Sequence, residues 1–418
     1  MVRVLLSFCL LVLLISCGED KTVNYQLSTV NYLSPVDYEI TLAGNFGEPR
    51  PWHFHGGLDI KTNNEEGKPI FSVADGYVSR LTVGMYGFGN AIYVCHPDGH
   101  TSVYCHLQRF APEYEALLQR KGHDTLSMVL PPTQFPVKAG QLIAISGNTG
   151  HSTGPHLHLE IHDTETWVMR DPMQFLGHLI ADTVAPQAHS LMAVPMPGEG
   201  VFCGSPDKQT FPINQPSTKV QRSTFIVQRS TSNVQRSTSK VQRSTFNVQR
   251  STFTAWGRVG FALWADDYSE ATYHHYGIRR MQLLVDGREV FRSDVDSIPI
   301  SCQPEVNLWG DYDYWRHHRR WYMKAYREPR MRLPILHTDL HRGIVNFNEE
   351  RPYRLTFVLS DYQNNRATYH LTVLGQRDAS VSVAAGARAV SGQPRQPALL
   401  DDYRLFRQCL WPLMTTKR

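Results

Sequence analysis

The fold of this chain is decided by Gly147–Ile161, which reads Gly-Asn-Thr-Gly-His-Ser-Thr-Gly-Pro-His-Leu-His-Leu-Glu-Ile. A turn rich in glycine and proline leads into an apolar run that carries His156 and His158. Side chains alternate between the two faces of a strand, so these histidines should point the same way. Two imidazoles held on one strand suit a zinc ion. An isolated His-x-His pair arises often by chance, so the hypothesis depends on partners elsewhere in the chain.

An upstream segment supplies two such partners, His55 and Asp59, which are four residues apart. The glycines at 56 and 57 between them disfavour a helix and favour an extended segment. One carboxylate and two histidines leave the fourth position of a zinc ion open to water, as a catalytic site requires.

A third segment, Thr101–Leu107, alternates as a strand and carries His106 at its end. If the alternation continues to that histidine, the neighbouring Cys105 faces away from the metal. Each of the three segments is weak evidence for a zinc site when taken alone, but the three together in this order indicate such a site strongly.

At these residues the chain resembles the LytM-type, lysostaphin-like zinc endopeptidases, which cut peptide bridges in bacterial peptidoglycan. The family patterns H-x-x-x-D, Y-x-H-L and G-P-H-L-H-x-E are all matched, within a resemblance that covers roughly residues 36 to 176. The resemblance implies that His55, Asp59 and His158 bind one zinc ion. It also implies that His106 and His156 are catalytic without binding the metal.

The resemblance implies a definite chemistry for these residues. Zinc lowers the pKa of bound water from about 15.7 towards roughly 7 and polarises the scissile carbonyl. One of His106 and His156 accepts a proton, and the other stabilises the oxyanion or protonates the leaving amine. The sequence leaves open which does which.

Two further residues are candidates for supporting roles. Glu160 falls on the same strand face as His158, where it either orients an imidazole or is an ordinary strand glutamate. Asn148 either binds substrate backbone or belongs to the turn, and turn chemistry is the favoured interpretation.

The N-terminus predicts the compartment. Arg3 precedes the apolar stretch Val4–Ile15, which has the length of a signal-peptide core. Residues 14–17 resemble a bacterial lipobox, so we expect residues 1–17 to be a lipoprotein signal peptide with lipid attached to Cys17. An ordinary secretory signal is the alternative. Residues 18–35 then form a tether. These features predict a lipid-anchored protein of the cell envelope that faces the periplasm, on the outer membrane of a Gram-negative bacterium.

The fold class is predicted to be dominated by β-structure. Residues 36–182 should form an antiparallel β-sheet peptidase domain, and residues 183–375 an immunoglobulin-like β-sandwich. The helical stretch Pro112–Lys121, within an insertion at 110–138, is expected to lie over the site. Two-part chains of this kind resemble envelope lipoproteins of a Bacteroidetes-like type. The strands expected in the first domain are 70–73, 76–83, 91–95, 101–106, 142–146 and 156–162, and those in the second are 257–264, 280–285, 289–292, 343–347, 353–360 and 367–373.

An aromatic cluster in the second domain allows two interpretations. It binds glycan or, as the composition favours, contributes to the core and to edge strands. The cluster consists of Trp309, Tyr312, Tyr314, Trp315, Trp321 and Tyr322.

A low-complexity segment at 217–254 interrupts the second domain. Val-Gln-Arg-Ser-Thr recurs there five times with a period of seven, with only one reliably apolar position per repeat. That pattern is neither a coiled coil nor a solenoid, and we expect a disordered insertion. It carries seven of the 42 basic residues and no acid, so the net charge of +4 becomes about −3 without it. Residues 376–418 are expected to be a flexible tail.

The function predicted from the sequence is hydrolysis of peptide cross-links in peptidoglycan, with a D,D-endopeptidase preferred. The expected partners are peptidoglycan peptide stems, the membrane through the N-terminal lipid, and envelope proteins through the β-sandwich. Nucleic acid is not expected, since the basic charge belongs to the repeat. One alternative is a non-catalytic adaptor that recruits or activates another hydrolase. Another is proteolysis of protein substrates. The chain has no H-E-x-x-H and no G-x-S-x-G motif.

Overall fold

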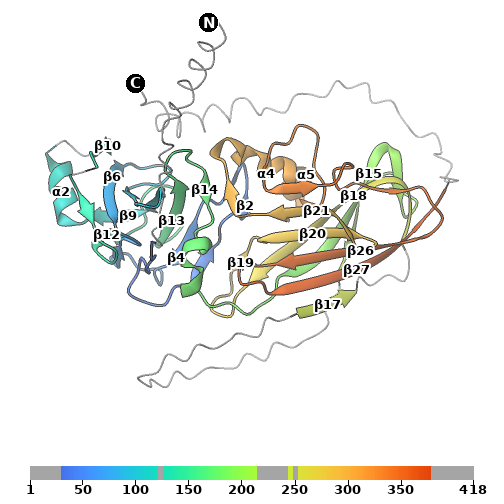
Figure 1. Ribbon diagram of the computed structural model, residues 1–418, viewed down its shortest axis with the longest axis horizontal. Coiled ribbons are helices and arrows are strands. Elements are labelled where there is room, and N and C mark those ends of the chain that lie inside the picture. The colour runs from blue at the N-terminus through green and yellow to red at the C-terminus, as the bar shows by residue number, and fades with distance from the viewer. Residues whose placement is uncertain (1–29, 121–125, 133, 214–242, 248–252, 378–418) are drawn as a thin grey trace, which may run out of the picture.

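The computed structural model describes residues 30–120, 126–132, 134–213, 243–247 and 253–377, which form two β domains arranged along the long axis (Figure 1). The predicted signal peptide with Cys17, most of the predicted tether and nearly all of the predicted C-terminal tail lie outside the described residues. Within the described ranges, no helix has the length and apolar character needed to cross a membrane.

The first domain is built on an antiparallel sheet, as predicted. Its strand order is β1-β4-β13-β8-β7-β6-β10. These strands are β1 (Leu42–Gly44), β4 (Leu58–Lys61), β13 (His156–Asp163), β8 (His100–Cys105), β7 (Ala91–Cys95), β6 (Gly76–Val83) and β10 (Leu126–Val129). A smaller sheet contains β5 (Pro69–Phe71), β12 (Leu142–Ser146) and β9 (Leu107–Phe110). The remaining elements are β2 (Pro49–Arg50), β3 (His53–Phe54), α2 (Pro112–Gln119), β11 (Pro136–Val137), β14 (Met169–Arg170), α3 (Met173–Leu176) and the 3-10 helix η1 (Gly177–Leu179).

Strand β13 shows why its sequence alternates. Leu157, Leu159 and Ile161 are fully buried in the apolar core of the first domain. Each such side chain contributes about 1.5–3 kcal/mol through its removal from water. The intervening residues, among them His156 and His158, therefore point to the opposite face, where the site forms.

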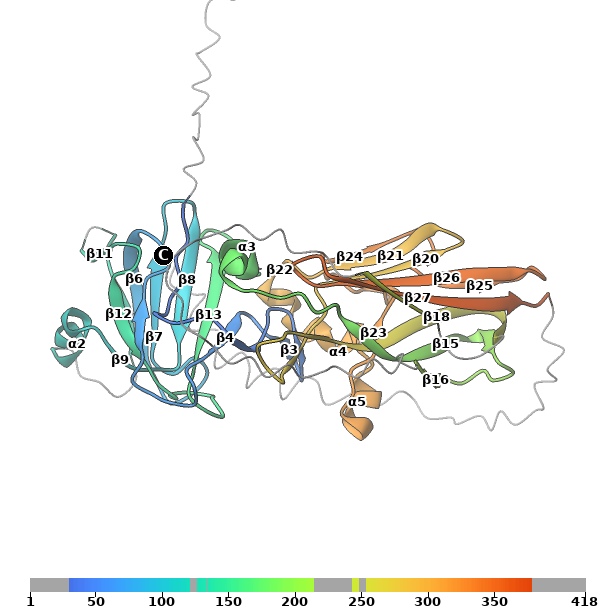
Figure 2. The same cartoon turned by 90° about the horizontal axis from the view of Figure 1, so that it is seen from below.

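The described residues of the insertion at 110–138, which are 110–120, 126–132 and 134–138, do not cover the site, contrary to expectation. Helix α2 packs Tyr114 and Leu118 into the core and lies at the outer end of the first domain, far along the long axis from β4 (Figures 1 and 2). Strand β10 extends the sheet beside β6, at the edge opposite β1. The insertion was expected over the site because sequence shows a helix but not the sheet edge to which it attaches.

The second domain is a single hydrogen-bonded sheet that curls on itself (Figure 2). Its main path is β16 (Gln209–Pro212), β15 (Gln187–Phe202), β18 (Phe253–Tyr268), β27 (Arg366–Gly375), β26 (Pro352–Ser360), β20 (Arg280–Val285), β21 (Arg288–Asp294) and β24 (Leu336–Thr338). The other elements are β17 (Arg243–Asn247), β19 (His275–Tyr276), β22 (Ser297–Ile298), η2 (Ile300–Glu305), α4 (Val306–Trp309), α5 (Tyr312–His318), β23 (Met323–Lys324) and β25 (Val345–Phe347).

The immunoglobulin-like sandwich is not confirmed. Strands β15 and β18 are each 16 residues long, and their pairing shifts register between Pro195 and Gly200. Such a bulge increases the local bend and twist of the strands. Strand β18 pairs with β15 on one side and with β27, β25, β23 and β19 in succession, so the chain closes around its core without splitting into two sheets.

Part of the repeat segment is ordered, which corrects the expectation of a wholly disordered insertion. Strand β17 pairs in parallel with residues 366–370 of β27. Strand β18 pairs only with residues 373–375 of the same strand. The backbone of 366–370 would otherwise be an open edge, and an open edge readily accepts an added strand.

The buried members of the aromatic cluster fit the favoured interpretation, and glycan binding by the cluster stays a prediction. Trp309 and Tyr322 are buried, and Nε1 of Trp309 donates to the carbonyl of Lys324, as a core role requires. Trp315 and Trp321 are half-buried and stack with ring centroids 5.3 Å apart.

Strand pairing, side-chain hydrogen bonds and a buried side chain join the two domains. Strand β14 pairs with both β13 and β22, so the sheet of the first domain continues into the second. The Asn45 side chain donates to the carbonyl of Gly277 and accepts from its N–H, both at 2.9 Å. Phe54, directly before His55, packs in the core of the second domain, and its N–H donates to Gln303.

Candidate metal centre

Three predicted ligands converge on one point. Nε2 of His55 lies 3.0 Å from Oδ1 of Asp59 and 3.0 Å from Nδ1 of His158. Nδ1 of His158 lies 2.8 Å from the same Asp59 oxygen. Register explains the meeting, since His158 on β13 stands directly opposite Asp59 on β4. Zinc–ligand bonds of about 2.0–2.1 Å in a tetrahedron separate the ligand atoms by about 3.3 Å, so the trio fits zinc after small shifts.

Hydrogen bonds select the nitrogen that each histidine presents. Nδ1 of His55 donates to the carbonyl of Asn45 at 2.6 Å, which leaves the Nε2 lone pair facing Asp59. Nε2 of His158 donates to Glu160 at 2.9 Å, which leaves the Nδ1 lone pair facing the same point. A carboxylate or carbonyl behind a ligating imidazole fixes its tautomer and raises its basicity.

The predicted catalytic pair lies beside this trio. The ring centroids of His106 and His156 are 4.8 Å apart, and both rings group with His158. Nδ1 of His106 donates to the carbonyl of Thr149 at 2.8 Å, and Nδ1 of His156 donates to that of Gly154 at 2.8 Å. Both side chains therefore keep an Nε2 lone pair that can accept a proton.

Burial and neighbouring charges set the protonation of the site. Burial lowers the pKa of His55 to about 4. Burial, together with repulsion from His158 and His156, lowers the pKa of His106 to about 3. Burial alone would lower the pKa of His158, but hydrogen bonds to Asp59 and Glu160 raise it to about 9.

The aspartate is held as an anion. Burial raises the pKa of Asp59. The surrounding histidines, led by His55, lower it by more than burial raises it, so the net pKa is well below its ordinary value. Nη2 of Arg50 also lies 2.8 Å from Oδ2 of Asp59. One carboxylate oxygen is thus occupied by the guanidinium, while the other faces the histidines.

The glycines beside His55 permit close approach of β13. A Cβ at Gly57 would lie 2.2 Å from the carbonyl oxygen of Leu159, and one at Gly56 would lie 2.3 Å from Oε1 of Glu160. The pair therefore makes room for the strand and for the carboxylate that supports His158.

The expectation from strand alternation that Cys105 faces away from the metal is wrong. Strand β8 ends at Cys105, and His106 has a left-handed backbone with φ of 60°. Cys105 stands opposite His158 in the antiparallel ladder, so it shares the face of the site and does not point away from it. His106 joins the site because the turn, not the strand, directs it.

The sequence interpretation missed several supporting residues. Arg50 and the carbonyls of Asn45 and Thr149 gave no signal, because short-range patterns do not show which loops meet the site. His162 was not among the predicted site residues, yet its Nε2 lies 2.5 Å from Oε2 of Glu160. Its position two residues after Glu160 on one strand would have placed it on this face.

In the turn before β13, Thr149 rather than the predicted candidate Asn148 contacts the site. The Asn148 side chain is exposed. The neighbouring Thr149 does more than form the turn. Its hydroxyl donates to the carbonyl of Leu107 at 2.9 Å, and its carbonyl holds His106.

Comparison with known proteins agrees with this geometry. Residues 53–120 and 125–170 match the model of peptidase family M23. An uncharacterized metalloprotease of Haemophilus influenzae is 34% identical over 116 residues, covering 28% of this chain and 19% of that protein. The DD-carboxypeptidase/endopeptidase Mpg of Neisseria meningitidis is 32% identical over 109 residues, covering 26% and 20%. The glycyl-glycine endopeptidase ALE-1 of Staphylococcus capitis is 34% identical over 125 residues, covering 29% and 29%.

The chain thus spans about a fifth of the length of the first two relatives. The matched part contains all five residues of the site, including the trio of His55, Asp59 and His158. The first domain is an M23 metallopeptidase domain with an intact His-His-Asp metal site.

Proposed function

We propose that this protein is a zinc-dependent endopeptidase that hydrolyses peptide cross-links of bacterial peptidoglycan. The observation that carries the proposal is the convergence of the ligand atoms of His55, Asp59 and His158 to within 3.0 Å of one another. His106 and His156 lie beside them, each with its Nδ1 bound to a backbone carbonyl, and Nε2 of His156 lies 3.4 Å from Oδ1 of Asp59. A site that only bound polymer would not need two further imidazoles with fixed tautomers.

The proposed roles follow from these atoms. His55, Asp59 and His158 hold one zinc ion, which when bound supplies a Lewis acid and lowers the pKa of water. His106 and His156 move protons at their Nε2 atoms, one taking a proton from water and the other serving the oxyanion or the leaving amine. Their carbonyl partners keep both rings oriented, so little reorganisation is needed when the reaction begins.

The proposed substrate is a D,D-type cross-link in a peptide stem. Among the relatives, the Neisseria protein is a DD-carboxypeptidase/endopeptidase and the Staphylococcus protein a glycyl-glycine endopeptidase. The lipobox-like residues before Cys17 favour a Gram-negative envelope, where we propose lipid anchoring on the outer membrane facing the periplasm. In this proposal residues 36–182 catalyse, and residues 183–375 position the enzyme and contact envelope proteins.

The test is digestion of purified sacculi by the zinc-loaded protein, with released muropeptides separated by chromatography. We expect uncross-linked peptides to accumulate, a chelator to stop their release, and zinc to restore it. His158→Ala should lose stoichiometric zinc and activity together. His151→Ala is the matched control, since His151 is exposed in the same loop region.

Two other outcomes would replace the proposal. Binding of sacculi with every cross-link intact, by protein that contains zinc, would favour the adaptor. Cleavage of glycine-rich peptides without any change in sacculi would favour a protease of protein substrates.

A further inference from the structure

A second cluster of metal-type side chains lies between the two domains, apart from the histidine centre. Asp182 belongs to the segment after η1 that leads into β15, Asp267 lies on β18, and Asp361 follows β26. One carboxylate oxygen from each lies within 4.8 Å of the other two. Three segments far apart in the sequence therefore bring three acids to one place.

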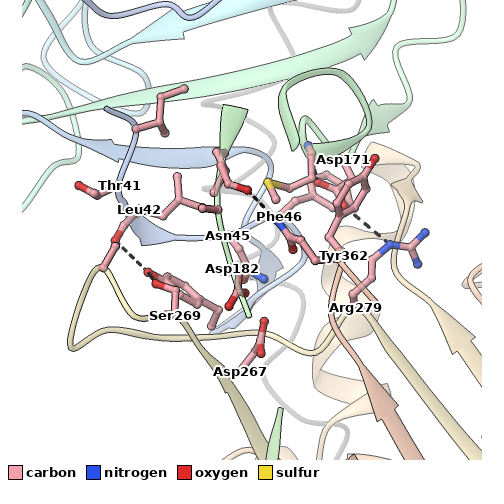
Figure 3. A pocket seen from close by; sticks show the side chains of 17 residues that line it. Thr41, Leu42, Asn45, Phe46, Asp171, Asp182, Asp267, Ser269, Arg279 and Tyr362 are labelled. Carbon is pink, nitrogen blue, oxygen red and sulfur yellow. Dashed lines mark hydrogen bonds and ion pairs between the residues drawn. The ribbon is translucent and has the colours of Figure 1, made fainter. Parts of the chain in front are cut away.

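The cluster is enclosed and adjoins a cavity. Asp267 is 5% exposed and Asp361 is 4% exposed. Asp182 and Asp267 line a cavity of about 50 Å³, toward which their carboxylates point (Figure 3). Oδ1 of Asp267 is buried and has no hydrogen-bond partner among the described residues. A buried carboxylate oxygen without a partner is costly, which indicates a missing positive ligand.

The other two carboxylates are held in place by hydrogen bonds. Asp361 accepts from the backbone N–H of Asn365 at 2.8 Å and from its Nδ2 at 2.6 Å. Asp182 accepts from the N–H of Val184 at 2.9 Å, and Nδ2 of Asn365 also donates to the carbonyl of Asp182 at 3.2 Å. These bonds fix the carboxylates side by side, although like charges would otherwise separate them.

The one cationic side chain that lines the cavity is engaged by other acids. Arg279 is the one cationic residue among those that line it, and its guanidinium pairs with Asp171, Asp294 and Asp296. Burial, followed by repulsion from neighbouring acids, raises the pKa of Asp182 to about 7. Among the described residues that line the cavity, no cationic side chain therefore pairs with Asp182 or Asp267.

We propose that Asp182, Asp267 and Asp361 bind a hard divalent cation of the calcium type. Oxygen-only donors suit calcium rather than zinc, which prefers nitrogen and sulfur. Calcium–oxygen bonds of about 2.3–2.6 Å place oxygens on opposite sides of the ion about 4.6–5.2 Å apart, and the observed spread is within 4.8 Å. The cavity leaves room for water to complete the coordination.

The position of this ion gives it a structural role. Asp182 lies in the connection between the domains, whereas Asp267 and Asp361 belong to the second domain. A bound cation ties that connection to the second domain. It thereby fixes the start of β15 relative to the metal centre of the first domain.

The test is calcium titration of the full, zinc-loaded protein after removal of other divalent ions. We expect one calcium per chain, tighter binding of calcium than of magnesium, and a rise of about 5 °C in the melting temperature at saturation. Asp267→Asn, which keeps the shape of the side chain, should weaken calcium binding at least 10-fold. Asp207→Asn, at an exposed position, is the matched control.

Two further measurements keep the outcome clear. Unchanged zinc stoichiometry in Asp267→Asn shows that the variant is folded, and His158→Ala should still bind calcium, since the two sites are separate. Terbium, excited through tyrosine, reports the same site by luminescence, with Tyr276 lining the cavity. No saturable calcium binding, equal binding by Asp267→Asn, or a preference for zinc at this cluster would overturn the proposal.

Discussion

Nε2 of His158 lies 2.9 Å from Oε1 of Glu160, two residues further along the same strand. The second oxygen of Glu160 lies 2.5 Å from Nε2 of His162, whose ring stacks on Trp167. Both carboxylate oxygens are therefore used, and the imidazole of His158 is aimed at Asp59 by a partner on its own strand.

Replacement of Glu160 by Gln should weaken zinc binding about 10- to 100-fold, the usual cost of losing a partner behind a ligating histidine. The amide would present an N–H group to His158 or to His162, each of which presents a donor to the carboxylate. Zinc affinity is measured by competition with a chromophoric chelator. Glu165→Gln, at an exposed position in the turn after β13, should bind zinc like the unchanged protein. Equal zinc affinity in both variants would show that Glu160 does not support zinc binding.

Loss of either non-ligand histidine should separate activity from metal content. His106→Ala and His156→Ala are each expected to lower kcat by about 10²–10⁴ with one zinc still bound, because they move protons rather than hold the ion. The measurement pairs metal analysis with initial rates of cross-link cleavage. Loss of zinc from either variant would instead make that histidine a ligand.

Gly57→Ala should destabilise the first domain by about 1–3 kcal/mol, as expected for overpacking. The added Cβ would meet the backbone oxygen of Leu159 at 2.2 Å, and a backbone atom of a central strand cannot move aside. Urea unfolding measures the change. Gly84→Ala is the control, since nothing lies within 4 Å of its Cβ position. Equal stability of the two variants would contradict the close packing of β4 on β13.

Asp171→Asn should change how stability depends on pH. Burial raises the pKa of Asp171 from 3.8 to about 7, partly offset by the N–H of Met173 and by Arg279, while Asp296 raises it further. Its folded-state pKa lies above the unfolded value, so this contribution to stability is fully present below about pH 4 and is lost as the pH rises through 7.

Thermal unfolding at pH 5 and pH 8 checks this sign. Relative to the unchanged protein, Asp171→Asn should gain stability at pH 8 by at most about 2.6 kcal/mol compared with pH 5, because about two of the three units of pKa shift fall in this interval, at about 1.4 kcal/mol per unit. Calcium is held constant, because Asp171 shares its cavity with Asp182 and Asp267 and also faces Tyr362. An identical pH response in both proteins would show that Asp171 is ionised throughout.

The residues of the metal centre could be predicted because they belong to short sequence motifs, H-x-x-x-D, Y-x-H-L and G-P-H-L-H-x-E, that follow one another in a fixed order. Alternation on one strand placed His156 and His158 together, and the glycines at 56 and 57 favoured an extended segment over a helix. The same rule failed one residue after β8, where His106 takes a left-handed backbone that no local pattern announces.

Long-range relationships were not predictable in this way. The expected strands of the second domain match β18, β20, β21, β25, β26 and β27 in outline, but the 16-residue β15 was not among them. Whether the strands form one curled sheet or two stacked ones depends on how β15 and β18 bend. The pairing of β14 with β22 joins two-residue strands, which leave no periodic signal. The acidic cluster draws on three segments far apart in the sequence, and no local pattern shows that they meet.

The residue before the first metal ligand is anchored in the other domain. Phe54 has no exposed surface, packs among residues of the second domain and donates its N–H to Gln303. A truncated chain lacking the second domain would leave His55 directly after a strand, β3, whose support has been removed. We therefore expect the metal centre to depend on both domains, so that a substitution at their contact, such as one at Gln303, would disturb His55 without touching a metal ligand.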